Sequence, residues 1–407
     1  MRVQFLGGAS RVGSLGMLLD HDHDLLLFDY GYLPSKPPGY PMKAPPVRNA
    51  YLSHAHIDHS GMVPWLCGRH DTNVFATLPT IATSDLLFED SIKVLDLEGY
   101  PQPFDEDDLE TTRRNTREMR WGETRKEGDL EITSHSAGHI PGATMYETVN
   151  REIILFTGDI HTLSTELVWG AKPVKCDTLV LESTYAGRRH PDRLKLDHDF
   201  LKKVEEILDR GGKVIIPAFA VGRTQEMLLI LRRKRFEIWL DGMGKRVNRI
   251  YLDYPEALRS AMKLRKAVKD AKRVRSERGR ERALKGEIII STSGMLDGGP
   301  VLRYIDKIKD DPKSGILLTG YQVEGTNGRR LKESGVLKIS GASVKVECEV
   351  SFFDFSAHAD HDDLLKFIDG CDPERVILCH GDSRELLASD IEGREVLMPK
   401  EGEWVVL

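Results

Sequence analysis

The segment His54-Ala55-His56-Ile57-Asp58-His59 places four metal-ligating side chains within six residues. It follows an apolar, strand-like run, and a helix is expected over His59–Cys67. In an extended chain His54 and His56 face one way, whereas Asp58 and His59 lie on the turn into the helix and can face a second ion. Imidazole and carboxylate ligands suit zinc. A solvated histidine-rich turn is the alternative, but four ligands exceed the needs of one structural site.

Three further candidate ligands stand at the ends of predicted strands. His139 lies in a run of small residues that allow close approach to an ion, Asp159 follows the strand 153–157, and His380 ends the strand 376–379. Alone, each residue is more often structural. Their common position favours function, because sites in layered α/β folds gather at strand ends.

The composition is that of an ordinary globular protein. The 407 residues include 40% hydrophobic residues, enough for a large core, and their length favours two domains. No apolar run is long enough to span a membrane, and the first residues enter a strand directly, so neither a membrane partner nor a signal peptide is expected. The five cysteines form no CxxC pair. A reducing cytoplasm is therefore the expected location, and a disulfide scaffold is disfavoured.

The strand and helix patterns change twice along the chain. The first 185 residues consist mainly of short strands, and strands alternate with helices from about residue 194, as in a parallel α/β layer. After about residue 335 the short strands return. We therefore predict one domain formed by residues 1–190 and 335–407, interrupted by an insertion at 191–334.

Together with the motif His54–His59, further sequence motifs resemble a known protein superfamily, and they extend over nearly the whole chain. The order Asp29, His54–His59, His139, Asp159 resembles the metallo-β-lactamase superfamily. Three further motifs resemble its β-CASP branch of metal-dependent nucleases: Leu181-Glu182-Ser183-Thr184-Tyr185, Ser356-Ala357-His358-Ala359-Asp360 and Cys379-His380-Gly381-Asp382. Segments at 222–226, 293–300 and 320–326 are similar to the cleavage-and-polyadenylation nuclease subfamily, especially its archaeal members.

This resemblance implies a fold and a set of roles. The fold is an α/β metallo-β-lactamase αββα sandwich with an inserted β-CASP α/β domain. Because the chain begins directly at the sandwich, we expect it to lack the RNA-binding KH module of some archaeal relatives. Two zinc ions per chain are implied, with Asp159 bridging them and Asp29 orienting the histidine motif. The ligands of the first ion would be His54, His56 and His139, and those of the second Asp58, His59 and His380.

The resemblance also implies the chemistry. The two zinc ions would activate a water molecule, which attacks phosphorus in line, and Asp58 belongs to this catalytic centre. The leaving ribose oxygen then needs a proton, for which His358 is the best donor, held protonated by Glu182. A buried, satisfied carboxylate is the alternative for Glu182. His135 and His161 flank motif residues and are candidates for supporting contacts.

Two features of the insertion suggest phosphate contacts. Arg223 and Ser293 lie in glycine-rich turns that lead into helices and can hold a phosphate, although such turns are often only turns. The segment Arg259–Lys285 has twelve basic and three acidic residues, a net +9 in a chain of net −6. It is either a solvated helix face or a strip that binds phosphates.

The tract Asp20–Asp24 is predicted to be a solvated hairpin turn rather than a metal site.

The resemblance leads us to predict a zinc-dependent ribonuclease acting on single-stranded RNA in processing or decay, as an endonuclease, a 5′-to-3′ exonuclease or both. A DNA nuclease of the same branch and a catalytically silent RNA-binding subunit are the alternatives. Histidine at position 380 favours RNA, since DNA-repair members of the branch tend to have valine there. RNA is the expected partner, and the sequence is compatible with a homodimer.

Overall fold

The computed structural model describes residues 1–339 and 341–407. Contacts within the chain divide it into two compact units. The first contains Met1–Ser164, Trp169–Arg189 and Ala357–Leu407, and the second contains Thr165–Val168 and His190–Ser356. Within the described residues, no helix combines the length and the apolar character needed to cross a membrane.

The first unit contains two seven-stranded sheets. The strands of the first sheet, in spatial order, are β22 (Trp404–Val406), β1 (Arg2–Gly7), β2 (Gly16–His21), β3 (Asp24–Phe28), β4 (Asn49–Tyr51), β5 (Asn73–Ala76) and β6 (Thr116–Glu118). Those of the second are β21 (Glu395–Leu397), β20 (Arg375–Cys379), β11 (Thr178–Glu182), β10 (Ile153–Phe156), β9 (Thr144–Val149), β8 (Leu130–Ser136) and β7 (Thr124–Glu127).

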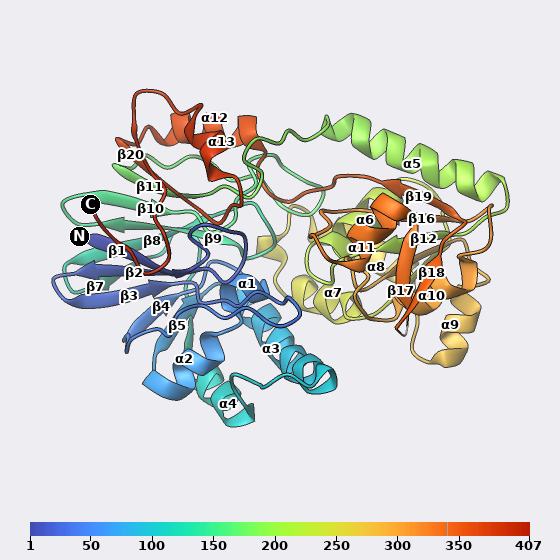
Figure 1. Cartoon of the computed structure of the whole chain (residues 1–407), viewed down its shortest axis with the longest axis horizontal. Helices are drawn as coiled ribbons and strands as arrows, with labels where there is room; N and C mark the ends of the chain where they lie inside the picture. Colours follow the sequence, from blue (N-terminus) through green and yellow to red (C-terminus); the bar gives the residue numbers. More distant parts are fainter. Residues whose placement is uncertain (340) are drawn as a thin grey trace. The chain divides into compact units, whose positions relative to one another are not determined.

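The two sheets enclose an apolar core, and helices cover their outer faces. Phe5 and Met17 belong to the cluster between the sheets, whereas Leu6 and Leu18, one residue further along each strand, pack toward the helices. Strands buried on both faces read as continuous apolar runs, which explains the sequence pattern. The helices on the first sheet are α2 (Val63–His70), α3 (Leu78–Glu98) and α4 (Glu106–Asn115), and those beside the second are α12 (His361–Cys371) and α13 (Arg384–Ala388) (Figure 1). The predicted αββα sandwich is thereby confirmed.

The short helix α1 (Ile57–Ser60) follows β4 and carries the second half of the histidine motif. The single helix predicted over His59–Cys67 is wrong, because α1 ends before α2 begins. Between them the chain is held by Tyr30, whose N–H donates to the carbonyl of His59 and whose carbonyl accepts from Met62. These two hydrogen bonds of 2.7 and 2.8 Å replace the helical bonds that a continuous helix would make.

The second unit is a parallel α/β layer. Its sheet has the order β14 (Lys272–Arg273), β13 (Ile238–Asp241), β15 (Ile288–Ser291), β12 (Val214–Pro217), β16 (Gly315–Leu318) and β19 (Glu349–Phe352). The helices are α5 (Arg193–Asp209), α6 (Arg223–Leu231), α7 (Gly244–Asp253), α8 (Ala261–Asp270), α9 (Glu277–Ala283), α10 (Val301–Ile308) and α11 (Asn327–Ser334), with a 3-10 turn at Pro255–Ala257. The strands β17 (Val336–Ile339) and β18 (Ala342–Lys345) form a separate two-stranded sheet.

The limits of the second unit differ from those predicted for the insertion. The unit runs on to Ser356 rather than ending at 334, because β19 pairs in parallel with β16 and so extends its sheet. The unit also includes Thr165–Val168, which precedes the main insertion. The buried carboxylate of Glu226 accepts hydrogen bonds from the backbone N–H groups of Glu166 and Leu167, at 3.0 and 2.9 Å.

The tract Asp20–Asp24 forms the predicted hairpin turn. His21 pairs with Asp24 in the antiparallel ladder of β2 and β3. Asp22 and His23 between them both have a left-handed backbone, with φ of 49° and 72°. This combination is typical of a tight two-residue hairpin turn, and aspartate tolerates it better than most residues do.

Candidate metal centre

The predicted metal ligands of the first unit all follow the ends of strands. His54 and His56 lie after β4, and Asp58 and His59 on α1. His139, Asp159 and His380 follow β8, β10 and β20, respectively. Since the strands end at one edge of the sandwich, side chains from distant parts of the sequence converge there. The structure brings all seven together in two groups.

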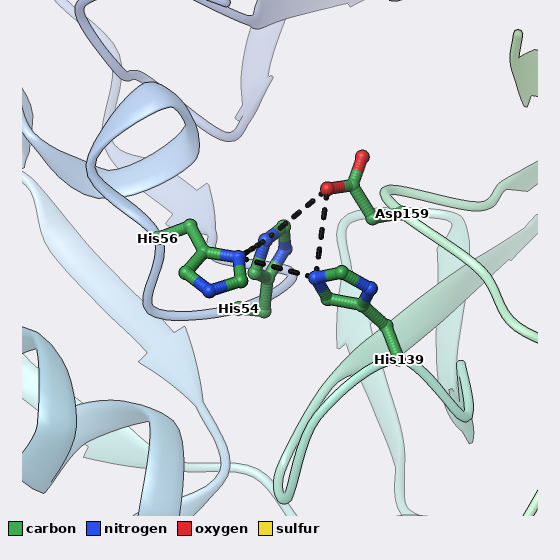
Figure 2. Close-up of side chains that lie close together, drawn as sticks. All are labelled: His54, His56, His139 and Asp159. Atoms are coloured by element: carbon green, nitrogen blue, oxygen red, sulfur yellow. Dashed lines mark hydrogen bonds and ion pairs between the residues drawn. The ribbon is translucent and has the colours of Figure 1, made fainter. Parts of the chain in front are cut away.

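The first group contains His54, His56, His139 and Asp159, whose ligand atoms all lie within 4.8 Å of one another. His56 Nδ1 is 3.0 Å from His54 Nε2 and 3.1 Å from His139 Nε2. Asp159 Oδ2 is 3.5 Å from His54 Nε2 and 3.7 Å from His139 Nε2. Figure 2 shows the three rings and the carboxylate directed toward one another.

The second group contains Asp58, His59 and His380, again within 4.8 Å. His380 Nε2 is 3.7 Å from Asp58 Oδ2. The other oxygen of Asp159, Oδ1, is 3.2 Å from His59 Nε2 and 3.7 Å from His380 Nε2. Each oxygen of Asp159 therefore faces one of the two groups.

The donor set fits metal ions. His59 Nε2, Asp159 Oδ1 and both ring nitrogens of His380 are buried without a hydrogen-bond partner. Buried polar atoms without partners are rare, and metal ions would satisfy His59 Nε2, Asp159 Oδ1 and the Nε2 nitrogen of His380. Burial lowers the pKa of His56 to about 4 and lowers those of His54, His139 and His380 as well. These rings are consequently neutral, which is the state that binds zinc.

Asp29 fixes the position of the histidine motif through hydrogen bonds to His59 and Ser53. His59 Nδ1 donates to Asp29 Oδ2 at 2.7 Å, which leaves His59 Nε2 directed at the cluster. The same carboxylate accepts hydrogen bonds of 2.6 Å from the backbone N–H and the hydroxyl of Ser53. Such contacts fix the tautomer and the orientation of a ligating ring. Asp29 itself has a left-handed backbone, with φ of 56°.

Two supporting groups were not identified from the sequence. Ser53 directly precedes the histidine motif, and its position there is the only signal that could have indicated a role. The carbonyl of Ala357 accepts a 2.8 Å hydrogen bond from His139 Nδ1. No side-chain pattern reveals a contact made by a backbone carbonyl.

His358 and Glu182 lie beside the cluster as an ion pair. His358 Nδ1 is 2.9 and 3.1 Å from the two oxygens of Glu182, and its Nε2 is 3.9 Å from Asp159 Oδ2. Glu182 is buried and also accepts a 2.9 Å hydrogen bond from the backbone of Ile160. Burial alone would lower the pKa of His358, but the charges of Glu182 and Asp159 outweigh it and raise the pKa to about 9.

The other candidates differ in their positions. His161 is buried, and its Nδ1 is 3.0 Å from the carbonyl of His358, so it adjoins the ion pair. His135 pairs instead with Glu147, at 2.7 Å, on the neighbouring strand. Arg223 and Ser293 belong to the second unit, where Arg223 begins α6 and Ser293 follows β15. Their contact with phosphate stays a prediction.

Comparison with family models gives two matches. Residues 224–331 match the Beta-Casp domain, and residues 343–399 match the Zn-dependent metallo-hydrolase RNA specificity domain. The first match lies within the second unit. The other begins in that unit and ends in the last segment of the first.

Similar curated proteins cover almost the whole chain. The Probable RNase MJ4 of Methanocaldococcus jannaschii is 35% identical over 99% of both chains. RNase aCSPSF2 of Saccharolobus solfataricus is 32% identical over 100% of this chain and 85% of its own length. Transcription termination factor FttA of M. jannaschii is 30% identical over 95% of this chain and 68% of its own. A solved protein of unknown function from Enterococcus faecalis shares the fold, with a TM-score of 0.65 and 15% identity over 100% of this chain and 99% of its own.

Replacing Asp29 by asparagine is expected to weaken zinc binding. In Asp29→Asn the amide nitrogen cannot accept the hydrogen bond from His59 Nδ1, so the ring loses its fixed orientation. Loss of such an orienting contact typically lowers metal affinity by about 10–100-fold. Zinc affinity is measured by competition with a chromogenic chelator.

The matched control is Asp20→Asn. Asp20 is also a buried aspartate of the first sheet, but it pairs with Arg2, at 2.6 Å, outside the cluster. Both variants should unfold within a few degrees of the parent protein. Equal zinc affinity in the two variants would contradict a role for Asp29 in the metal centre.

Proposed function

Because the chain belongs to the β-CASP family of metallo-hydrolases, we propose that it is a zinc-dependent ribonuclease that hydrolyses the phosphodiester bonds of single-stranded RNA. The observation that carries this proposal is the cluster of seven ligand side chains, most of them buried, in which the two oxygens of Asp159 face separate groups. The names of two relatives, RNase MJ4 and RNase aCSPSF2, support a ribonuclease. The expected homodimer stays a prediction.

The two groups would hold two zinc ions. His54, His56 and His139 would hold one ion, Asp58, His59 and His380 would hold the other, and Asp159 would contact both. When bound, a zinc pair activates water at neutral pH and stabilises the charge that develops on a phosphate. Burial lowers the pKa values of His54, His56, His139 and His380 and so favours their neutral rings. The carboxylates of Asp159 and Asp29 outweigh burial and raise the pKa of His59, which would therefore release a proton when it binds an ion.

The leaving 3′-oxygen of the ribose needs a proton, and we assign its delivery to His358. The paired carboxylate of Glu182 favours the protonated imidazolium, and Nε2 is the nitrogen that faces the metal cluster. A positioned acid of this kind typically contributes about 10²–10⁴-fold to the rate. Because water attacks rather than the 2′-hydroxyl, the products should carry a 5′-phosphate and a 3′-hydroxyl.

RNA should be cut much faster than DNA of the same sequence. Histidine at position 380 supports this preference through the family resemblance, but it does not itself recognise a 2′-hydroxyl, so further contacts must contribute. The test digests matched RNA and DNA strands, labelled at either end, with zinc-loaded protein. The labelled ends also separate internal cleavage from stepwise 5′-to-3′ degradation.

Asp58→Ala serves as the inactive control for this test, and it should fold normally because the sheet core does not depend on this half-buried side chain. Equal rates on RNA and DNA would refute the substrate assignment. Products ending in a 2′,3′-cyclic phosphate would refute attack by water. Full activity of Asp58→Ala, or of the metal-free parent in chelator, would show that the nuclease does not depend on the cluster.

Removal of the proposed acid should slow cleavage without loss of metal. We expect His358→Ala to lower the single-turnover cleavage rate by about 10²–10⁴-fold while its zinc content stays at the parent value. His135→Ala is the matched control, because His135 also pairs with a glutamate of the first unit but lies on the β8–β9 ladder. Loss of zinc from His358→Ala would instead make His358 a ligand.

The basic segment Arg259–Lys285 forms α8, β14 and α9 of the second unit. Some of its cations neutralise acids of the same unit: Lys263 lies 3.7 Å from Glu166, and Arg280 lies 2.9 Å from Asp241. Most of the others are exposed to solvent: Arg265, Lys266, Lys269, Arg273, Arg275, Arg278, Arg282 and Lys285. We propose that these exposed cations bind the phosphates of RNA.

Neutralising part of this segment should reduce the salt dependence of RNA binding. Each phosphate contact with a single strand contributes about 0.7 to the slope of log affinity against log salt. The triple variant Arg273→Ala, Arg275→Ala, Arg278→Ala should therefore flatten the slope by about 2. A control with the same charge change replaces the exposed first-unit lysines Lys126, Lys175 and Lys366. An unchanged slope in the first variant would make the segment a solvated helix face.

A further inference from the structure

Two buried cysteines of the first unit lie side by side although 194 residues separate them in the sequence. Cys176 stands just before β11, and Cys371 is the last residue of α12. The backbone N–H of Cys176 donates to the carbonyl of Cys371 at 3.3 Å. Their relative exposures are 6% and 0%, and both thiols are free.

The separation of the two residues suits a covalent bond. A single backbone N–H···O=C hydrogen bond limits the distance between the two Cα atoms to about 7 Å, given the lengths of the bonds that connect them. Most of this range overlaps the separations of about 4.4–6.8 Å that a disulfide spans. The two thiols also hydrogen-bond to each other, which raises the pKa of Cys176 and lowers that of Cys371. Cys371 is thus the better nucleophile of the pair.

We propose that Cys176 and Cys371 form a reversible internal disulfide. This bond links the two first-unit segments that precede and follow the insertion. The chain between them includes His190–Ser356, the main segment of the second unit. A bond at this position would join the two parts of the first unit just outside the points where the chain leaves it and returns. This proposal is independent of the ribonuclease assignment.

The reaction requires an oxidant, and a small aliphatic disulfide supplies it. The Cys371 thiolate attacks one sulfur of the reagent, forms a mixed disulfide and releases one small thiol. The Cys176 thiolate then attacks the mixed disulfide at the sulfur of Cys371 and releases the second small thiol. Two protein thiols are oxidised to one disulfide, and one reagent disulfide is reduced to two thiols.

The cross-link should stabilise the folded protein. A disulfide restricts the unfolded chain more strongly the longer the loop it closes, and this loop is long. We expect the melting temperature to rise by roughly 5–15 °C on oxidation. Neither cysteine belongs to the metal cluster, so zinc content should not change.

The direct test is peptide mapping of the full-length protein after incubation with 2-hydroxyethyl disulfide and alkylation of the remaining thiols. Trypsin should release the peptide Cys176–Arg188 linked to Phe367–Arg375. The other three cysteines, Cys67, Cys348 and Cys379, should be recovered as alkylated thiols. Recovery of Cys176 and Cys371 as separate alkylated peptides, or as stable mixed disulfides, would refute the proposal.

Variants supply a second and independent measurement. In Cys371→Ala oxidation should no longer raise the melting temperature. In Cys348→Ala, which removes a buried cysteine of the second unit, the rise should persist. A rise that persists in Cys371→Ala, or its absence from the parent protein, would overturn the inference. The peptide map of the parent decides the matter even if a variant fails to fold.

Discussion

The buried carboxylate of Asp159 is the constraint on which the rest of the candidate site depends. It is 3% exposed, and each of its oxygens faces a different pair of imidazole nitrogens. Its position is set by the end of β10 and by Gly158, which has a left-handed backbone with φ of 52°. A side chain at Gly158 would lie 2.6 Å from Cβ of Ser53, the residue that bonds to Asp29. Gly158 therefore packs closely against Ser53, and this contact joins the loop that carries Asp159 to the loop that carries the histidine motif. The two loops come from different sheets.

The sandwich tolerates a large insertion because its second sheet is completed across the interruption. β11 precedes the insertion and β20 follows it, yet the two strands pair in parallel over five residues, from Thr178 opposite Arg375 to Glu182 opposite Cys379. This ladder ends next to Glu182 and His380, so the strand pairing that restores the sheet also positions these two side chains. The pairing of Cys176 with Cys371 lies at the beginning of the same ladder.

The parts of the molecule that could be predicted from the sequence are those whose structure depends on residues close together in the chain. The histidine motif and the turn at Asp22 and His23 belong to this class, because residue type and spacing constrain both of them. The sandwich was predicted through the family resemblance of the longer motifs. The break between α1 and α2 was missed, because it depends on hydrogen bonds to the distant Tyr30. The limit at Ser356 was missed for a similar reason: the sequence of the short strand β19 fits either unit, and only its pairing with β16 assigns it.

The segment that re-enters the first unit after the insertion acts on the site mainly through its backbone. The carbonyl of Ala357 orients His139, and the carbonyl of the next residue, His358, bonds to His161. The N–H of Ala359 donates to the carbonyl of Ile160, whose own N–H donates to Glu182. Two consecutive peptide groups, 357–358 and 358–359, thus connect His139, the loop after Asp159 and the partner of His358. Because consecutive peptide groups move together, a shift of this segment would disturb the first metal group and the proposed acid at the same time.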